Sequence, residues 1–205
     1  MKIAIIGAGN VGGALTKSLS KKGYKIFLGI RNLSSDRADK LKEFSENITL
    51  HSIPEAINSA EIVLFTTPSD AAVEIAKQNP SLKNKIIIDA TNSISRKPSP
   101  YKTAFEGIKN ETGCENIVKC FNSTGFENMN NPNYGDMAID MFVAGSSKKA
   151  KEIAKQLSND IGFSECYDFG GDDKVELLEQ LAVSWVNLAV FQKYGRNIAF
   201  KILKR

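Results

Sequence analysis

The sequence predicts an α/β protein: a Rossmann doubly wound parallel sheet with a small C-terminal α/β portion. Three observations predict this fold. The chain opens with a β-branched run that leads into G-x-G-x-x-G, apolar runs typical of buried strands alternate with segments of helical spacing, and 205 residues can bury a sizeable core. We expect residues 1–120 to form the dinucleotide-binding domain and residues 121–205 to form the C-terminal portion, with a terminal helical segment.

The first element pair has the form of a βαβ unit. Residues 2–6 are a short apolar run that predicts a buried strand, and residues 25–28 predict a second one. The segment between them, residues 10–22, has helical spacing and stops at Gly23. Its apolar positions are Val11, Ala14, Leu15 and Leu19. The whole unit is about 30 residues long, as a parallel crossover requires.

The same alternation predicts the elements that follow. We expect further helices at 34–46, 54–59, 69–78, 101–109 and 147–160. We expect further strands at 48–50, 61–66, 85–89, 116–120, 140–144 and 165–168. Residues 93–100 and 121–136 are expected to be loops because they are rich in Ser, Pro, Asn and Gly. The tail from residue 172 is expected to be helical.

Composition excludes several classes of protein. A hydrophobic fraction of 42% and a charged fraction of 24% are typical of a globular protein, and a net charge of +4 is too small to indicate nucleic-acid binding. The apolar run at 181–191 is shorter than the ~20 residues of a membrane span. Three cysteines without a Cys-x-x-Cys pair favour neither a disulfide framework nor a metal site. We therefore expect a cytoplasmic protein with no membrane or nucleic-acid partner.

The glycine pattern predicts a dinucleotide site. Gly7 permits a tight turn, Gly9 lets a pyrophosphate approach the backbone, and Gly12 lets helix and strand pack closely. The intervening Ala8, Asn10 and Val11 place free N–H groups at the start of the helix, where they can bind an anion. The alternative is a sharp turn that binds nothing.

The residues after the second strand indicate which dinucleotide binds. An NAD site places Asp or Glu there, whereas this chain has Arg31 and no acidic residue before Asp36. A guanidinium can stack on adenine and pair with a 2′-phosphate. Asn32 and Ser34 or Ser35 can add hydrogen bonds. The sequence therefore predicts NADP(H) as the cofactor.

Small and polar residues follow the next two strands. In an open parallel sheet, ligands bind outside the carboxyl ends of the strands. The nicotinamide half is therefore expected beside Thr66, Thr67, Pro68 and Ser69, and beside Ala90, Thr91 and Asn92. These groups can hydrogen-bond a ribose and a carboxamide but transfer protons poorly. Alternatively, Thr-Pro ends a strand and Ser69 caps a helix.

The usual proton-transfer groups of an alcohol dehydrogenase are missing. His51 is the sole histidine and lies toward the sheet edge, and no Tyr-x-x-x-Lys is present. We therefore name no catalytic residue and no metal ligand. This absence favours a reaction in which the protein aligns two redox cofactors, so that hydride passes from NADPH directly to a flavin or deazaflavin.

Several segments carry a family resemblance over nearly the whole chain. They are the opening IAIIGAGNVGGAL, the strand end FLGIRN, Val-Lys-Cys-Phe-Asn at 118–122, MFVAG at 141–145 and the terminal NIAFKILKR. Together they resemble the F420-dependent NADP oxidoreductase-like family. Val-Lys-x-Phe-Asn is also similar to the NADPH-binding domain of the STEAP metalloreductases.

The resemblance implies an NADP-dependent oxidoreductase that passes hydride between the nicotinamide and a deazaflavin, F420, in a cleft, commonly as a homodimer. It places Gly7–Gly12 on the pyrophosphate, Arg31 on the 2′-phosphate, and Asn122, Ser123 and Thr124, with Ser69, at the acceptor. The chain departs from the family pattern at Ile30, where Ser is usual, and at Asn122, where His is usual. FMN or FAD therefore stays open as the hydride partner.

Two questions remain open at this point. The predicted helix at 175–194 is apolar on more than one face, which fits a dimer contact, a wall of the acceptor cleft or burial within the monomer. Two other functions also remain: an NADPH-dependent imine or keto reductase, and a non-catalytic NADP(H) sensor.

Overall fold

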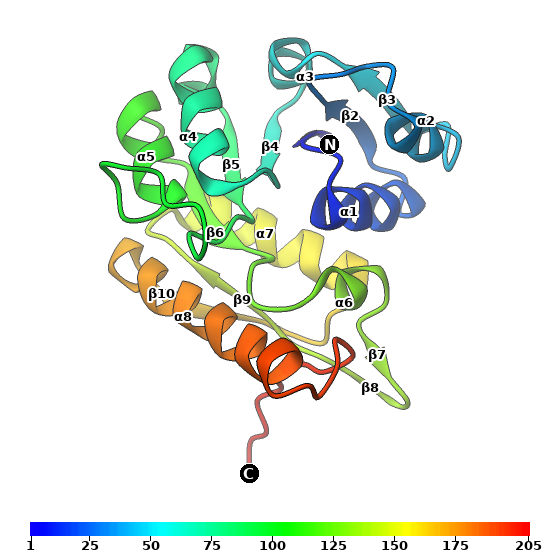
Figure 1. Cartoon of the computed structure of the whole chain (residues 1–205), viewed down its shortest axis with the longest axis vertical. Helices are drawn as coiled ribbons and strands as arrows, with labels where there is room; N and C mark the ends of the chain where they lie inside the picture. Colours follow the sequence, from blue (N-terminus) through cyan, green and yellow to red (C-terminus); the bar gives the residue numbers. More distant parts are fainter.

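A computed structural model describes residues 1–205, and its core is one eight-stranded sheet in the order β10-β9-β6-β5-β4-β1-β2-β3 (Figure 1). Its strands are β1 (Lys2–Ile6), β2 (Lys25–Gly29), β3 (Ile48–His51), β4 (Ile62–Phe65), β5 (Ile86–Asp89), β6 (Ile117–Cys120), β9 (Met141–Ala144) and β10 (Cys166–Gly170). The first six strands, β1 to β6, run parallel to one another. The expected doubly wound parallel sheet is therefore confirmed.

The direction of the sheet changes once. β9 pairs antiparallel with β6, through Lys119 opposite Ala144, and β10 runs parallel to β9. The C-terminal portion thus extends the same sheet by two strands that point the other way.

Helices cover both faces of the sheet and make it the middle of three layers. The helices are α1 (Asn10–Lys21), α2 (Asp36–Lys42), α3 (Ile53–Ser59), α4 (Ser69–Gln78), α5 (Ala104–Thr112), α6 (Phe126–Asn130), α7 (Lys148–Ile161) and α8 (Val175–Val186). One core contains buried residues of α1, α2, α6 and α7, and the other contains those of α3, α4, α5 and α8. Strands between two apolar layers need side chains that are apolar on both sides, which is why β1 and β4 are continuous hydrophobic runs.

The expected loop at 121–136 is partly wrong. It contains the short helix α6 and a hairpin of β7 (Asn133–Tyr134) and β8 (Met137–Ala138), with Gly135 in the left-handed region at the turn. A helix of five residues and strands of two are too short to show a periodicity in the sequence.

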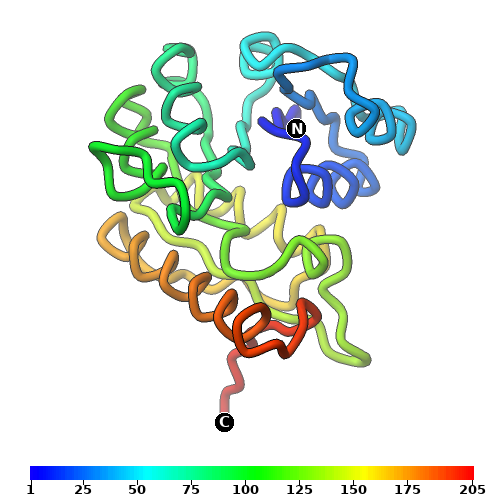
Figure 2. The backbone as a smooth tube through the Cα atoms, viewed as in Figure 1, coloured from blue at the N-terminus to red at the C-terminus, as the bar shows by residue number.

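The helical tail is also shorter than expected. α8 passes into a π-helical turn at Asn187–Phe191, and the chain beyond it has no regular secondary structure. Tertiary hydrogen bonds hold this irregular segment: Trp185 Nε1 donates to Ile198 O at 2.7 Å, and Ile202 N donates to Asp140 Oδ2 at 2.8 Å. The last residues project away from the body of the molecule (Figure 2).

Candidate functional site

The glycine turn joins β1 to α1 with very little space. Gly7 has φ of 109°, and its N–H donates to Gly29 O at 2.9 Å. A Cβ on Gly12 would clash with Gly7 O and lie 2.6 Å from Thr66 Oγ1, so this position requires glycine. Gly9 has open space around it and precedes α1 without a side-chain cap. The first N–H groups of α1 are therefore free to bind an anion.

A cavity of about 600 Å³ lies along this turn. Its walls include Gly7, Ala8, Gly9, Arg31, Asn32, Thr66, Thr67 and Pro68, all predicted from the sequence. Thr67 Oγ1 is buried and has no hydrogen-bond partner, so a polar group of a ligand could satisfy it. We call this hollow the dinucleotide cavity, because a glycine cradle, a helix start and an exposed cation meet in it.

Sequence reasoning missed one wall of the dinucleotide cavity. Ala71, Glu74, Ile75 and Gln78 of α4 line it. Their spacing places them on one face of the helix, and that spacing is the signal that could have found them. Glu74 is the only carboxylate on the walls of this cavity.

The end of β2 supplies exposed positive charge. Arg31 is exposed and has no carboxylate within ion-pair distance. Asn32 Oδ1 accepts a hydrogen bond from Ser34 N at 3.0 Å, and the Ser35 hydroxyl caps α2. These short polar side chains thus shape the turn that carries Arg31.

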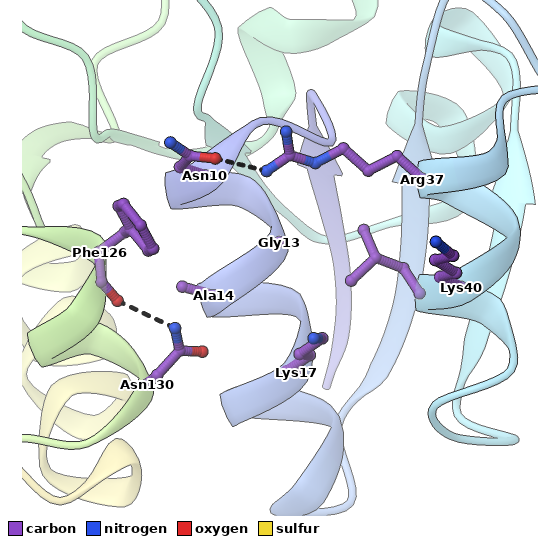
Figure 3. Close-up of a pocket in the computed structure, with 9 residues that line it drawn as sticks. Asn10, Gly13, Ala14, Lys17, Arg37, Lys40, Phe126 and Asn130 are labelled. Atoms are coloured by element: carbon purple, nitrogen blue, oxygen red, sulfur yellow. Dashed lines mark hydrogen bonds between the residues drawn. The ribbon is translucent and has the colours of Figure 1, made fainter.

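A second arginine, Arg37, was not predicted. It reaches from α2 across the first turn of α1, where its Nη2 donates to Asn10 Oδ1 at 2.6 Å (Figure 3). Asn10 belongs to the glycine motif, so Arg37 lies beside the expected pyrophosphate position. Arg37 and Asn10 are 27 residues apart in the chain, so the sequence alone could not predict this contact.

A second hollow, of about 250 Å³, brings α1, the segment after β6 and α8 together. We call it the acceptor cavity. Its walls include Asn10, Val11, Asn92, Asn122, Thr124, Phe126, Trp185 and Arg196. Asn92 Nδ2 donates to Asn122 O at 2.9 Å, and Asn122 Nδ2 donates to Asn92 Oδ1 at 3.1 Å. Asn122 Oδ1 is buried and has no hydrogen-bond partner within the protein, so this wall residue keeps an unsatisfied acceptor atom.

Not all predicted residues lie on these walls. Ser69 is buried, and its hydroxyl donates to Arg96 O; Ser123 is buried, and its hydroxyl contacts Met141 Sδ at 3.6 Å. Ser34, Gly12, Ala90 and Thr91 also line neither cavity. His51 packs against Phe27 with ring centroids 5.3 Å apart, at the sheet edge.

A buried charge cluster supports the acceptor cavity. Lys119 Nζ, which is fully buried, lies 2.7 Å from Asp89 Oδ2 and 2.6 Å from Glu179 Oε1, and it also donates to Thr91 O at 2.9 Å. Burial alone would lower the pKa of Lys119, but the two carboxylates outweigh burial and hold this pKa above its ordinary value. The cluster fixes α8 and the segment before Asn92 to the sheet.

α8 forms one wall of the acceptor cavity through Ala182, Trp185 and Val186. This is one of the roles that the apolar pattern of the helix left open. Leu177 of α8 and Phe191 of the π-helical turn that follows it are exposed at 54% and 71%, and a dimer contact through this region stays a prediction. None of the helices is long and apolar enough to cross a membrane.

Comparison with known proteins identifies relatives over the full chain. Residues 2–93 match the family described as NADP oxidoreductase, coenzyme F420-dependent. The chain is 25% identical to an F420-dependent NADP reductase of Methanothermobacter thermautotrophicus, over 98% of this chain and 94% of that protein. It is 26% identical to the reductase of the same name from Methanocaldococcus jannaschii, over 94% of both chains.

Solved structures share the fold. A candidate F420-dependent NADP reductase from Arthrobacter sp. FB24 has a TM-score of 0.86 at 22% identity and covers 100% of both chains. An Aspergillus terreus reductive aminase in complex with NADPH has a TM-score of 0.68 at 21% identity, and the match covers 94% of this chain but 63% of that one. Residues 2–93, less than half of the chain, therefore match the family described as NADP oxidoreductase, coenzyme F420-dependent, and nearly the whole chain is similar to reductases of that name.

Proposed function

We propose that this oxidoreductase transfers hydride between NADP(H), bound in the dinucleotide cavity, and a deazaflavin of the F420 type, bound in the acceptor cavity. The observation that carries the proposal is Arg31, an exposed and unpaired guanidinium at the end of β2 in the position where an NAD site has a carboxylate. The names of the full-length relatives support the same cofactor pair.

The protein's own part in this reaction is binding and alignment. When bound, NADPH supplies a hydride from C4 of its dihydronicotinamide ring, and the acceptor takes up that hydride with one proton from water. The first N–H groups of α1 bind the pyrophosphate, and Arg31 pairs with the 2′-phosphate. Asn122 Oδ1, which is buried and unpartnered, accepts a hydrogen bond from an N–H of the acceptor ring or of the nicotinamide carboxamide. The buried cluster at Lys119 keeps α8 in place, so the two rings are held together.

Substitution of Arg31 tests the cofactor assignment. A hydrogen-bonded charge pair is worth about 1.5–3 kcal/mol, so Arg31→Ala should weaken NADPH binding roughly 10- to 100-fold and weaken NADH binding far less, because NADH loses only the stacking on adenine. Fluorescence titration of both nucleotides measures this. Lys25→Ala, which removes an exposed cation from the other end of β2, is the matched control. Equal losses for NADPH and NADH would contradict the assignment.

The same protein separates the remaining functions. A sensor would bind NADPH in an Arg31-dependent manner without oxidising it in the presence of F420, flavins or imines. An imine or keto reductase would oxidise NADPH with a cyclic imine or ketone and leave F420 unreduced. F420 reduction with consumption of an equal amount of NADPH is the outcome that the proposed function requires.

A further inference from the structure

A third hollow, of about 220 Å³, lies on the outer side of α1 between α2 and α6, as Figure 3 shows. We call it the basic groove. It is lined by Asn10, Gly13, Ala14, Lys17, Arg37, Lys40, Leu41, Phe126 and Asn130. Nothing in the proposed function so far uses Lys17 or Lys40.

The charge of the basic groove is not balanced within the protein. Three of its lining residues are cations and none is acidic. Lys17, Arg37 and Lys40 have no carboxylate within 4.0 Å, and the only recorded partner of Arg37 is the neutral carboxamide of Asn10. Three cations gathered in one concave surface repel one another and favour a bound anion.

Lysines in two other hollows behave differently. Lys102 and Lys109 line hollows beside α5, and each has a carboxylate partner: Glu176 at 3.2 Å for Lys102, and Asp172 at 2.8 Å for Lys109. Lys97, in the same hollow as Lys102, has no ion pair, but carboxylates line both of those hollows and Glu176 lines each of them. The basic groove differs because its walls contain cations and no carboxylate.

The basic groove adjoins the acceptor cavity. Asn10 and Phe126 line both hollows. Lys17 lies seven residues after Asn10 on α1, and a rise of 1.5 Å per residue places it about 10 Å farther along the helix. A ligand with its ring in the acceptor cavity could therefore extend a chain of about that length past Phe126 and reach Lys17 and Lys40.

We propose that the basic groove binds the anionic tail of the redox acceptor, a phosphate or carboxylate group joined to the ring by a linker on the order of 10 Å. This inference rests on the proposed function and deepens it, because it predicts a preference for acceptors with a charged tail. Lys17 and Lys40 would bind the tail through charge-assisted contacts, and the linker would lie beside Phe126.

A pair of acceptors with the same ring tests the proposal. Coenzyme F420 carries a phosphodiester and glutamate carboxylates, whereas its tail-free deazaflavin alcohol carries neither. With the full chain and saturating NADPH, we expect the KM of the wild type to be lower for F420 than for the tail-free alcohol. Loss of two exposed ion pairs corresponds to about a tenfold change, so Lys17→Ala/Lys40→Ala should raise the KM for F420 about tenfold. The kcat and the KM for the tail-free acceptor should be unchanged.

Lys21→Ala/Lys42→Ala is the matched control. It removes two exposed cations from the same helices, α1 and α2, at positions outside the basic groove. Lys21 and Lys17 also contact the same Phe44 ring, at 5.2 and 5.3 Å, so loss of that contact is matched. This variant should leave the KM for both acceptors within about twofold of the wild type, because solvent and salt screen exposed charges that lie outside the basic groove.

Several outcomes would overturn the proposal. They are equal KM values for the two acceptors in the wild type, equal shifts in the two double variants, or a shift in the KM for NADPH alone, which would assign the groove to a phosphate of the dinucleotide. If neither acceptor is reduced, the proposed function fails. Titration of F420 against its tail-free form in the presence of NADP⁺ then still tests the groove, and equal dissociation constants would overturn it.

Discussion

Arg31 and Lys119 are both cations near the carboxyl ends of strands in one sheet, yet their surroundings differ. Arg31 is exposed and unpaired, and the same is true of Arg37 and Lys40 on the neighbouring helix. Lys119 is fully buried between two carboxylates. Around the glycine turn, which we call the glycine end, the cations are free to bind anions from solution. Around the acceptor cavity, which we call the acceptor end, carboxylates of the protein neutralise Lys119, and these ion pairs fix the elements around the cavity.

The largest expected effect comes from breaking the buried end. Lys119→Met leaves Asp89 and Glu179 without their cation, and removal of one partner of a buried pair costs about 3–5 kcal/mol. Urea unfolding should show this loss. Lys109→Met is the matched control: that ion pair is partly exposed, so the free energy of unfolding should fall by about 1 kcal/mol or less. Similar losses for the two variants would show that the buried cluster has no special role.

The second largest effect is expected from a substitution in the glycine turn between β1 and α1. Gly12→Ala places a methyl group against Gly7 O and Thr66 Oγ1, and such overpacking costs about 1–3 kcal/mol. The distorted turn should also lose NADPH binding. Gly13→Ala, one residue later in α1, meets only Leu41 methyl groups at 3.8 Å and should raise the free energy of unfolding by about 0.5–1 kcal/mol. Thermal unfolding and NADPH titration of the two variants check this contrast, and equal behaviour would contradict it.

The smallest expected effect concerns a hydrogen bond that joins the N-terminal part of the sheet to α7 of the C-terminal portion. Tyr24, just before β2, donates to Asp160 Oδ2 of α7 at 2.5 Å. Burial, together with the hydrogen bond and the negative charge of Asp160, raises the pKa of Tyr24 from 10.0 to about 12. The folded state therefore holds this proton more tightly than the unfolded state, so the contribution is complete below pH 10 and is lost between pH 10 and 12.

Tyr24→Phe should therefore cost about 1 kcal/mol at pH 8, and the difference from the wild type should disappear by pH 12. Unfolding curves of both proteins across this range measure it. The pKa values of Tyr101 and Tyr134 are also raised, but these residues are present in both proteins and cancel in the difference. A difference that does not change with pH would contradict the assignment.

The sequence was sufficient for the fold and for most of the glycine end. Buried parallel strands must be apolar on both faces, and the turn between β1 and α1 must have glycine at Gly7 and Gly12, so both leave a pattern that can be found without coordinates. Arg31 was found in the same way, because it directly follows a strand end.

The acceptor end could not be predicted to the same degree. Lys119 lies in an apolar run, and its partners Asp89 and Glu179 are far from it in the chain, so only the tertiary structure brings the three together. The same is true of Arg37 on Asn10. The tail was expected to be helical, but it is irregular beyond Phe191, where hydrogen bonds with Trp185 and Asp140 hold it against the rest of the molecule.

Because the strand direction reverses between β6 and β9, the carboxyl ends of β9 and β10 lie at the opposite edge of the sheet from the glycine turn. Because β9 and β10 run opposite to the other strands, the connections that follow them, at residues 145–147 and 171–174, open at the edge away from the glycine turn. Inserted segments or fused domains at these connections would therefore lie far from both cavities.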